Sequence, residues 1–369
     1  MTPRLFLLGD SLKIGGTEGQ FTEIACGLSR SGWEIDVSCL RAEGPLRSRL
    51  DAAGIRAWSG GPGSLKSPRA VLAVLRLARY FRMRRISLVH SFDFYSNILG
   101  VLAARLARVP VVVASQRDLG DLRPPFQRRV HRAILRLADH VLVNSPAVAE
   151  RLKGDRTVWP DRIIVIPNGV DVSRFRPALG PHRRPGDCVT IGTLAHLRPE
   201  KGLADIVHAA AIVCERYTNV RFIIWGDGPL RPDLQRLIDK HDLGQWVELR
   251  EATADPAAAL RELDIFVLAS HSEACSNALL EAMATRLAVI ATNAGGNAAL
   301  IEDERSGLLV PPADPLGLAK AIIRLIEDPG VARKFAERAF DRVRTDFTLT
   351  RTLDQLQTFY DSTLATSSA

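Results

Sequence analysis

Short apolar runs alternate with helix-like segments along the whole chain. The apolar runs have the length of buried strands, and the segments between them repeat apolar residues at the spacing of one helix face. Strands are predicted at Arg4–Leu8, Ile35–Leu40, Ile86–His90, Val111–Ser115, His140–Asn144, Ile163–Pro167, Val189–Leu194, Arg221–Trp225, Val247–Arg250, Ile265–Ala269, Ala288–Thr292 and Leu308–Val310. Helices are predicted at Thr17–Ser31, Asn97–Ala107, Leu203–Tyr217, Leu230–His241, Asn277–Thr285, Pro315–Glu327 and Ala332–Thr345. This alternation predicts parallel sheets with helices on both faces.

The alternation occurs twice, and a segment rich in Pro, Gly and Arg, Phe175–Asp187, separates the two halves. We therefore expect two doubly wound α/β domains, at residues 1–177 and 178–346. Ligands of such sheets bind outside the carboxyl ends of the strands. A cleft between the domains, faced by the carboxyl ends of both sheets, is the expected binding site.

Length and composition agree with two domains of a cytoplasmic protein. A chain of 369 residues is too long for one ordinary core. It has no run of 18 apolar residues that would span a membrane. The first residues enter a strand directly and lack the apolar core of a signal peptide. Five scattered cysteines without metal-ligand spacing indicate reduced thiols.

The net charge of +8 hides an asymmetry between the two halves. Residues 1–180 hold 28 Lys and Arg against 15 Asp and Glu, a net +13, whereas the remainder holds 21 against 26, a net −5. Much of the excess lies in Arg69–Arg85 and Arg123–Arg136, which mix arginines with apolar residues at helical spacing. Solvated helix faces would explain the pattern, and so would attraction to an anionic membrane surface. Nucleic acid is disfavoured because no recognition motif accompanies the charge.

The segment Ser270–Glu281 carries the most specific chemistry. Glu273 lies in a turn after a predicted strand, and Glu281 lies about two turns inside the helix that follows. The backbone N–H groups at the start of that helix favour an anion. Two carboxylates around such a helix end suit a sugar joined to a phosphate, although both could also be surface charges on a capped helix.

Other glycine-containing loops also follow predicted strands. Gly15 and Gly16 precede a helix, and Lys201 lies beside a helix start, where it can hold a phosphate. Gly226 opens Gly-Asp-Gly-Pro, and Thr292–Gly296 follows the two-glutamate segment. A tight turn alone would also explain the Gly-Gly pair. The loops of the second half together describe a phosphosugar or nucleotide pocket at one edge of a sheet.

Read together, these segments resemble the retaining family-4 glycosyltransferases of GT-B fold over nearly the whole chain. The resembling motifs are Gly-Gly-Thr-Glu (15–18), Ile-Pro-Asn-Gly-Val-Asp (166–171), Pro-Glu-Lys-Gly (199–202), Gly-Asp-Gly-Pro (226–229), the Glu-x7-Glu of Glu273 and Glu281, Glu-Ala-Met-Ala (281–284) and Gly-Leu-Leu-Val-Pro-Pro (307–312). Their order and spacing both match. The resemblance implies two Rossmann-like domains around a central cleft. It also implies that the closing segment, 347–369, is a helix that returns to the N-terminal domain.

The resemblance implies a role for each matched residue. Lys201 would neutralise the donor diphosphate, Glu273 would hold sugar hydroxyls, and Glu281 would grip the ribose. The implied donor-binding residues are Gly15, Gly16, His196, Lys201, Gly226, Arg250, Glu273, Cys275, Ser276, Asn277, Ala278 and Glu281. The implied catalytic residues are Glu273, Lys201 and Arg117. The fold generally needs no metal or other cofactor, because cationic side chains and a helix dipole stabilise the leaving diphosphate.

The chain departs from the family pattern at several of these positions. His196 stands where the family usually has arginine, and Arg117 or Gln116 stands where many members have histidine. The family's Glu-Gly-Phe-Pro-Asn is here Glu-Ala-Cys-Ser-Asn (273–277), which alters the pocket wall and leaves the donor sugar open. Packing or backbone contact is the favoured role of Cys275, ahead of a reactive thiol.

Three residues of the first half are assigned to the acceptor side. Arg117 follows one predicted strand, and His90 and Asp93 end or follow another. A histidine satisfied at a strand end is the alternative for His90.

The sequence thus predicts a retaining glycosyltransferase that uses a nucleotide-diphosphate sugar. Its acceptor would be a glycan or a polyprenyl- or lipid-linked intermediate at the inner face of the cell membrane. Two alternatives stay open: a sugar-nucleotide epimerase or phosphorylase of the same fold, and a catalytically weak nucleotide-sugar-binding subunit, which the replacements at His196 and Arg117 motivate.

Overall fold

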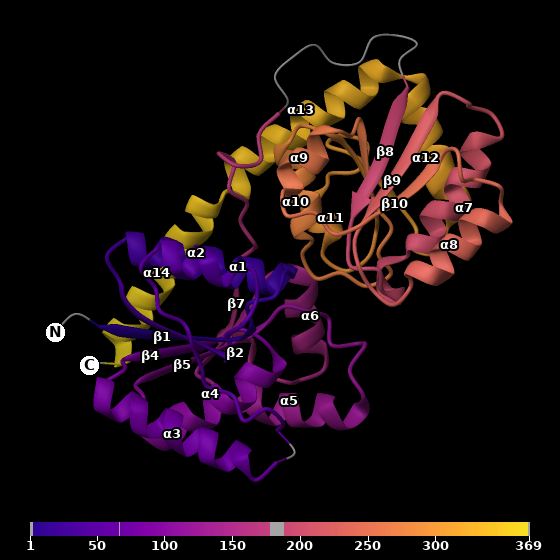
Figure 1. The fold of residues 1–369 in the computed structure, drawn as a ribbon. Helices are drawn as coiled ribbons and strands as arrows, with labels where there is room; N and C mark the ends of the chain where they lie inside the picture. The colour runs from indigo at the N-terminus through magenta and orange to yellow at the C-terminus, as the bar shows by residue number, and fades with distance from the viewer. Residues whose placement is uncertain (1–2, 66, 178–187, 368–369) are drawn as a thin grey trace. The chain divides into compact units, whose positions relative to one another are not determined.

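A computed structural model describes residues 3–65, 67–177 and 188–367. The chain divides into two compact units (Figure 1). Unit 1 comprises Met1–Asn168 and Leu349–Ala369, and unit 2 comprises Gly169–Thr348. The change from the first unit to the second therefore falls at Asn168, ahead of the expected position at 177. Most of the predicted linker, residues 178–187, lies outside the described residues.

Unit 1 contains a seven-stranded parallel sheet in the order β3-β2-β1-β4-β5-β6-β7. Its strands are β1 (Arg4–Ser11), β2 (Glu34–Arg41), β3 (Trp58–Ser59), β4 (Leu88–Ser91), β5 (Val111–Gln116), β6 (His140–Val143) and β7 (Ile163–Val165). Its helices are α1 (Gly16–Arg30), α2 (Arg47–Ala52), α3 (Arg69–Arg84), α4 (Phe94–Ala107), α5 (Pro125–Leu137), α6 (Pro146–Gly154) and α14 (Leu349–Ser367), with a 3-10 turn at Pro160–Arg162.

Two helical layers cover the sheet of unit 1. Helices α3, α4 and α5 pack side by side on one face, and α1 packs with α2 and α14 on the other (Figure 1). The central strands β4 and β5 are buried at every position, and β5 begins with the apolar run Val111–Ala114. The carboxyl ends of β1, β4 and β5 therefore share one edge, from which the loops discussed below emerge.

Unit 2 contains a six-stranded parallel sheet in the order β10-β9-β8-β11-β12-β13. Its strands are β8 (Val189–Leu194), β9 (Val220–Trp225), β10 (Val247–Arg250), β11 (Ile265–Leu268), β12 (Ala288–Thr292) and β13 (Leu308–Val310). Its helices are α7 (Leu203–Cys214), α8 (Arg231–Lys240), α9 (Pro256–Arg261), α10 (Asn277–Ala284), α11 (Asn297–Leu300), α12 (Pro315–Glu327) and α13 (Pro329–Asp346), with a 3-10 turn at Pro199–Lys201.

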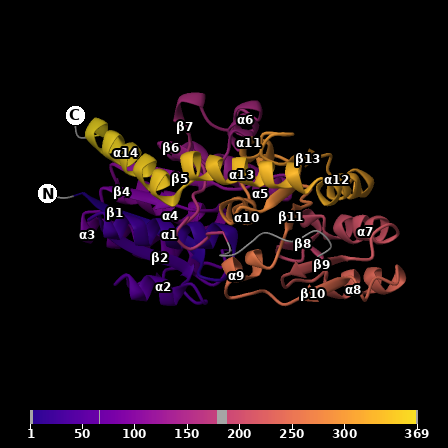
Figure 2. The ribbon, with the colours of Figure 1, turned by 90° about the horizontal axis from the view of Figure 1, so that it is seen from above.

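The sheet of unit 2 has a separate apolar core on each face. Residues of α7, α8 and α12 form one core, and α7 lies between the other two helices (Figure 2). Residues of α9, α10 and α13 form the other core. Because helices cover both faces, the reactive surface of the unit is left to the loops at the ends of its strands.

Helix α14 follows α13 directly but belongs to unit 1. Its Leu356 and Tyr360 are buried in the core of that unit. The Tyr360 hydroxyl lies 2.6 Å from Nδ1 of His90, and Gln357 donates to Ser31 of the α1 end at 3.0 Å. Gly27 of α1 lies so close to Leu353 that a Cβ there would meet its side chain at 2.3 Å. The last helix is therefore an integral part of unit 1.

The structure confirms two doubly wound parallel sheets, and all twelve predicted strands exist. The differences lie at ends and in short elements. Helix α7 ends at Cys214 rather than Tyr217, and β4 begins at Leu88 rather than Ile86. Five elements, β3, α2, α6, α9 and α11, were not predicted. Four of them have two to six residues, too few for a hydrophobic period to show, and α6 has only nine.

Candidate active site

An ion pair between Lys201 and Glu273 marks the loop edge of unit 2. Lys201 ends the 3-10 turn after β8, and Glu273 lies in the turn after β11. Their Nζ and Oε2 atoms are 2.7 Å apart, and the Ser270 hydroxyl donates to the same carboxylate oxygen at 3.2 Å. Both side chains are only partly exposed, 24% for the lysine and 12% for the glutamate. Partial burial makes this pair stronger than one on the open surface.

Backbone bonds fix the two loops that carry this pair. The His271 N–H donates to the Glu200 carbonyl at 2.8 Å, and its Nε2 lies 2.7 Å from the Asp205 carboxylate. On the other side, the Gly296 N–H donates to the Glu273 carbonyl at 2.9 Å. The pair is therefore anchored to the loops after β8 and β12 at once, which sets the position of the glutamate.

Helix α10 begins shortly after Glu273. Ser276 is its N-cap, and the Ser276 hydroxyl accepts the Leu279 N–H at 3.2 Å. The cap holds the first turn in place, so that the partial positive charge of the helix start lies beside the ion pair. Cys275 is buried in the core with Ala282 and Met283, which agrees with packing as its role. Glu281 is half-buried, on the second turn of the helix.

The other predicted donor-side residues of unit 2 lie on the loops at this edge. Gly226 has φ +156°, and a Cβ there would lie 1.8 Å from the Ala195 carbonyl oxygen. Glycine is thus required for close approach to the protein's own backbone. The Arg250 guanidinium is held by Glu248 and Glu262, at 2.8 Å and 2.7 Å. His196 is exposed in the loop after β8.

The glycine pair of unit 1 lies at the start of α1. Gly15 is the N-cap and has an extended backbone, φ −171°, that other residues adopt as well. A Cβ on Gly15 would instead meet the Glu18 carboxylate at 2.2 Å. That carboxylate also accepts the Ser11 hydroxyl at 3.1 Å. The small residue therefore leaves room for the Glu18 carboxylate at the helix start.

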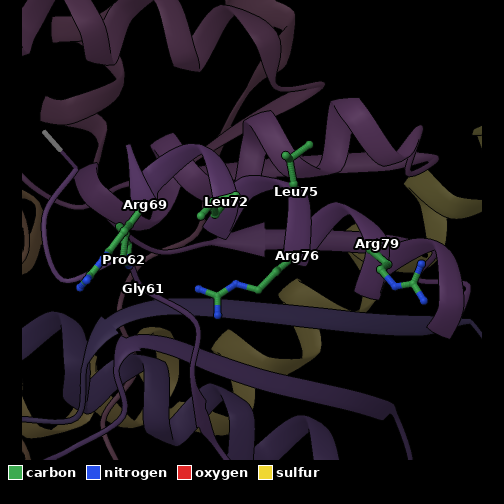
Figure 3. A pocket seen from close by; sticks show the side chains of 7 residues that line it. All are labelled: Gly61, Pro62, Arg69, Leu72, Leu75, Arg76 and Arg79. Atoms are coloured by element: carbon green, nitrogen blue, oxygen red, sulfur yellow. The ribbon is translucent and has the colours of Figure 1, made fainter. Parts of the chain in front are cut away.

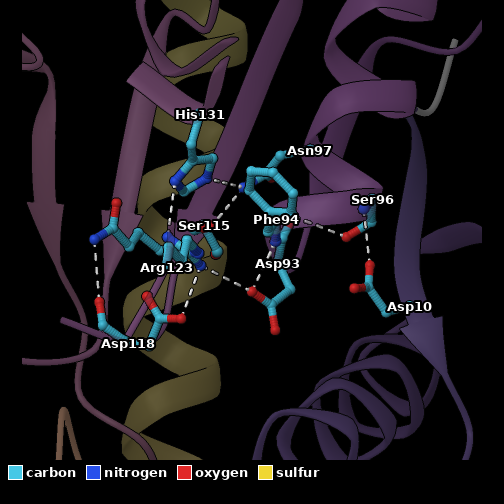
Figure 4. A network of polar contacts seen from close by, with 10 residues as sticks. Asp10, Asp93, Phe94, Ser96, Asn97, Ser115, Asp118, Arg123 and His131 are labelled. Atoms are coloured by element: carbon cyan, nitrogen blue, oxygen red, sulfur yellow. Dashed lines mark hydrogen bonds and ion pairs between the residues drawn. The ribbon is translucent and has the colours of Figure 1, made fainter. Parts of the chain in front are cut away.

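A polar network joins the end of β1 to the segments that follow β4 and β5 of unit 1 (Figure 4). Asp93 caps α4 by accepting the Phe94 N–H at 2.7 Å, and Arg123 bridges Asp93 and Asp118 at 3.4 Å and 2.8 Å. Arg123 also stacks over Phe94, with 5.2 Å to the ring centroid. The Asp10 carboxylate accepts the Ser96 N–H at 2.8 Å. Asp93, predicted for the acceptor side, thus lies within this network.

Burial shifts the titration of two groups in this network in opposite directions. Burial, reinforced by the nearby Asp93 carboxylate, raises the pKa of Asp10 to about 7. Burial, reinforced by the Arg123 guanidinium 3.0 Å away, lowers the pKa of His131 to about 3. Asp10 therefore changes protonation near neutral pH, while His131 stays neutral.

The remaining two predicted acceptor-side residues are both buried. Arg117 donates to the Asn168 amide oxygen and lies 5.7 Å from the centroid of the Phe92 ring. His90 has no exposed surface, and its ring nitrogens contact Tyr360 and Ser115 at 2.6 Å and 2.7 Å. Burial holds the pKa of His90 well below its usual value. These contacts are those expected of a satisfied histidine at a strand end, and the assignment of His90 to the acceptor side stays a prediction.

Sequence reasoning missed residues that organise both edges. Arg123 and Asp10 were not singled out, although both follow predicted strands, as the residues that were singled out also do. Arg231 was also missed; its guanidinium donates to the carbonyls of Leu249 and Arg250, at 2.9 Å and 3.1 Å. No local sequence signal marks such a contact across 18 residues.

The loop edge of unit 2 has the features of a known class of enzyme. A doubly wound sheet with a lysine, a glutamate and a capped helix start at one loop edge is typical of the donor half of a GT-B glycosyltransferase. Residues 15–169 match the model for the glycosyl transferase 4-like domain, and residues 186–328 match the model for glycosyl transferases group 1. The chain belongs to this glycosyltransferase family.

Two relatives illustrate the range of the family. One is a component of the Arabidopsis thaliana phosphatidylinositol N-acetylglucosaminyltransferase, 30% identical over 66% of this chain and 55% of its own length. An Escherichia coli UDP-Gal:alpha-D-GlcNAc-diphosphoundecaprenol alpha-1,3-galactosyltransferase is 25% identical over 90% of both chains. Among solved structures, Anabaena HepE in complex with UDP-glucose superposes with a TM-score of 0.86 at 21% identity, covering 97% of this chain and 99% of that one.

Proposed function

We propose that this protein is a retaining glycosyltransferase that moves a sugar from a nucleotide-diphosphate sugar to a glycan or lipid-linked acceptor. The contact between Lys201 and Glu273 beside the start of α10 is the observation that carries the proposal. The cation and the helix start suit the donor diphosphate, which gains charge as it leaves, and the carboxylate suits the sugar hydroxyls.

Donor binding would exchange the partners of this pair. A diphosphate carries more negative charge than one carboxylate, so it would take Lys201 from Glu273. Glu273 would then be free to accept hydrogen bonds from sugar hydroxyls. The amides from Cys275 to Ala278 would meet sugar and phosphate, and Glu281 would hold the ribose hydroxyls. The ion pair of the free protein thus keeps both groups preorganised at low cost.

The transfer itself would proceed without a covalent enzyme intermediate. The bond between the anomeric carbon and the diphosphate oxygen breaks, and Lys201 with the helix start stabilises the departing charge. The acceptor hydroxyl attacks the same face of the sugar, which retains the anomeric configuration. Its proton passes to the leaving diphosphate. We propose that neither a metal nor another cofactor takes part.

The acceptor would bind through the loop edge of unit 1. Asp10, Asp93 and Arg123 present carboxylate and guanidinium groups there, which suit the hydroxyls of a glycan. The two relatives from Arabidopsis and Escherichia coli are named for lipid-borne acceptors, phosphatidylinositol and a diphosphoundecaprenol-linked sugar. A lipid-linked acceptor would place the enzyme at the membrane surface in the cytoplasm.

A turnover assay with Glu273→Gln tests the proposal. Nucleotide sugars are first screened by thermal shift, because a donor at 100 times its dissociation constant stabilises by about 2.7 kcal/mol. With the best donor and lipid-linked acceptors, Glu273→Gln should lower kcat/KM by about a hundredfold or more, as loss of a group that acts on the transition state does. Glu327→Gln, which removes an exposed carboxylate paired with Arg216, should leave it within about twofold.

The same assay separates the alternatives. A catalytically weak binding subunit, favoured by His196 and Arg117, would bind the donor without turnover in the wild-type protein. An epimerase would convert the donor into an isomer without releasing nucleoside diphosphate. Full activity of Glu273→Gln would refute the assignment of the site itself.

A further inference from the structure

Three adjacent helices of unit 1 carry only positive charge. Helices α3, α4 and α5 contain ten arginines and no Asp or Glu. The helices on the opposite face, α1 and α14, contain acidic residues at Glu18, Glu23, Asp354 and Asp361. The positive excess of the N-terminal half is therefore gathered in one helical layer, which we call the basic layer.

Several arginines of the basic layer have no side-chain partner among the residues that the structure describes. Arg84 and Arg105 pair with Asp36 and Asp139. In contrast, five exposed arginines have guanidinium groups that make no hydrogen bond or ion pair within the described part of the chain. These are Arg69, Arg76, Arg79, Arg128 and Arg129. Their charge is therefore available to an external anionic partner.

Large apolar side chains are exposed on the same layer. Ten of the fourteen such residues in the described chain lie on these three helices or within four residues of them, at Val71, Leu72, Leu75, Met83, Tyr95, Leu102, Leu106, Leu122, Phe126 and Leu137. Phe126 is 75% and Met83 68% exposed. An apolar concentration of this kind on one side of a folded unit marks an interaction surface.

A shallow groove on α3 combines both features. It encloses about 630 Å³ and is lined by Leu72, Leu75 and the three unpaired arginines of α3, together with Gly61 and Pro62. Figure 3 shows the arginines spread along the helix on the side of the loop that carries Gly61 and Pro62. A row of arginines beside apolar side chains can contact several phosphate groups that lie in one plane. It fits such a surface better than it fits a single small anion.

We propose that the basic layer docks the protein on an anionic lipid bilayer. The exposed apolar side chains would enter the boundary between headgroups and acyl chains, and the arginines would meet lipid phosphates. An anionic bilayer fits a surface on which aliphatic residues are interleaved with arginine. A surface that binds single-stranded nucleic acid instead carries aromatic side chains on which the bases stack. The described helices include none that is long and apolar enough to span a membrane, so binding would be peripheral. The docking is argued from the basic layer alone. Its purpose, to bring the enzyme to lipid-borne acceptors, rests on the proposed function.

Vesicle co-flotation of the full chain tests the docking. Wild-type protein should float with vesicles of phosphatidylglycerol and phosphatidylcholine, and not with phosphatidylcholine alone. Binding should weaken with salt, because surface charges are screened. The triple variant Arg69→Gln, Arg76→Gln, Arg79→Gln should lose about a hundredfold in partitioning, since each cation near an anionic surface contributes about fivefold.

A matched variant controls for net charge. Arg333, Lys334 and Arg338 are exposed on α13 of unit 2, and their joint replacement by Gln removes the same charge. This control should float like the wild type. Equal loss in both triple variants would show attraction without a defined surface and would overturn the proposal. Replacing Leu72 and Leu75 by Ser should weaken the binding that persists at high salt.

Two further readouts distinguish docking from donor binding and from self-association. The triple variant should keep the thermal shift given by nucleoside diphosphate, so docking and donor binding can fail independently. Light scattering should show the same oligomeric state for wild type and variant. Absence of vesicle binding by the wild type refutes the docking, and a change of oligomeric state in the variant would assign the layer to a second copy of the chain instead.

Discussion

At the scale of single residues, unit 1 places carboxylates and imidazoles where burial opposes their charged forms. His90 and His131 are buried and neutral, and positive arginines lie beside both. Asp10 shows the converse effect, because burial and Asp93 favour its protonated form. Asp10 and His131, unlike His90, belong to the polar network at the loop edge, and perturbed groups gathered in this way are typical of functional sites. This supports the assignment of the unit 1 edge to substrate binding.

The buried histidines predict a loss of stability in acid. Below pH 6.5 the unfolded chain binds protons at these histidines, while folded His131 does so only near pH 3. The free energy of unfolding should therefore fall as pH decreases from 6.5 toward 3. The slope contributed by one such group is about 1.4 kcal/mol per pH unit.

Denaturant unfolding of His131→Gln between about pH 6.5 and 4 measures this contribution. The variant should be less stable at neutral pH but should show a shallower decline in acid. The surface change His241→Gln should reproduce the wild-type slope. A decline in His131→Gln as steep as in the wild type would show that this histidine is not the cause.

Residue identities in the donor site were predictable, but their contacts were not. Glu273 and Lys201 stand in motifs that local sequence displays. Their 2.7 Å contact joins positions 72 residues apart and depends on how β8 and β11 pair in the sheet. The contact of His90 with Tyr360, across 270 residues, also depends on the return of the last helix. Hydrophobic periodicity predicts which face of a helix or strand is buried, but not which residues of other elements contact that face.

At the scale of elements, the loops after the parallel strands pack on one another as well as on ligands. The loop after β9 illustrates this. Gly226 donates to the Arg250 carbonyl at 3.1 Å, and its Cα lies against the Ala195 carbonyl. The sequence predicts that Gly-Asp-Gly-Pro is one of the loops of a phosphosugar or nucleotide pocket. The structure shows that its first glycine is needed for loop packing whether or not a ligand binds.

Gly226→Ala should therefore destabilise unit 2 directly. A non-glycine residue at φ +156° costs on the order of 1–3 kcal/mol, and the 1.8 Å approach to a backbone oxygen adds to this cost. The midpoint temperature of thermal unfolding should fall by about 3 °C or more. Gly244→Ala, where a Cβ meets nothing within 4 Å, serves as the control and should change little. Unchanged unfolding of Gly226→Ala would contradict this packing role.

Elements with a full apolar period were predictable from the sequence. The strands of unit 2 at Val189–Leu194, Val247–Arg250, Ala288–Thr292 and Leu308–Val310 have the predicted bounds. The two-residue edge strand β3 and the four-residue α11 were missed, because tertiary contacts rather than local pattern stabilise such short pieces. Helices α3 and α5 have the helical character that their arginine spacing indicated.

At the scale of the whole molecule, the chain builds two similar units and divides chemistry between them. Unit 2 holds the lysine, the glutamate and the capped helix start, and unit 1 holds the acidic network and the basic layer. The excess positive charge that the sequence concentrates in its N-terminal half thus lies mainly on one helical layer of unit 1. The family and the fold followed from motifs spread over the whole chain. No motif specifies the donor sugar, the base or the acceptor, and the departure from the family pattern at Ala274–Ser276 leaves the donor sugar open.

Donor recognition by Lys201 and Glu273 is the central claim, and the affinity of nucleoside diphosphate tests it most directly. Calorimetric titration would use the diphosphate among UDP, GDP, ADP and TDP that stabilises the wild-type protein most. Because the two residues pair in the free protein, their substitutions should act in opposite directions. Lys201→Gln should weaken binding by roughly tenfold or more, the value of a charge-assisted hydrogen bond. Glu273→Gln should leave binding unchanged or tighten it, since the lysine is released, and Lys240→Gln should have no effect. Equal affinity for Lys201→Gln and the wild type, or an equal loss in both site variants, would contradict the account.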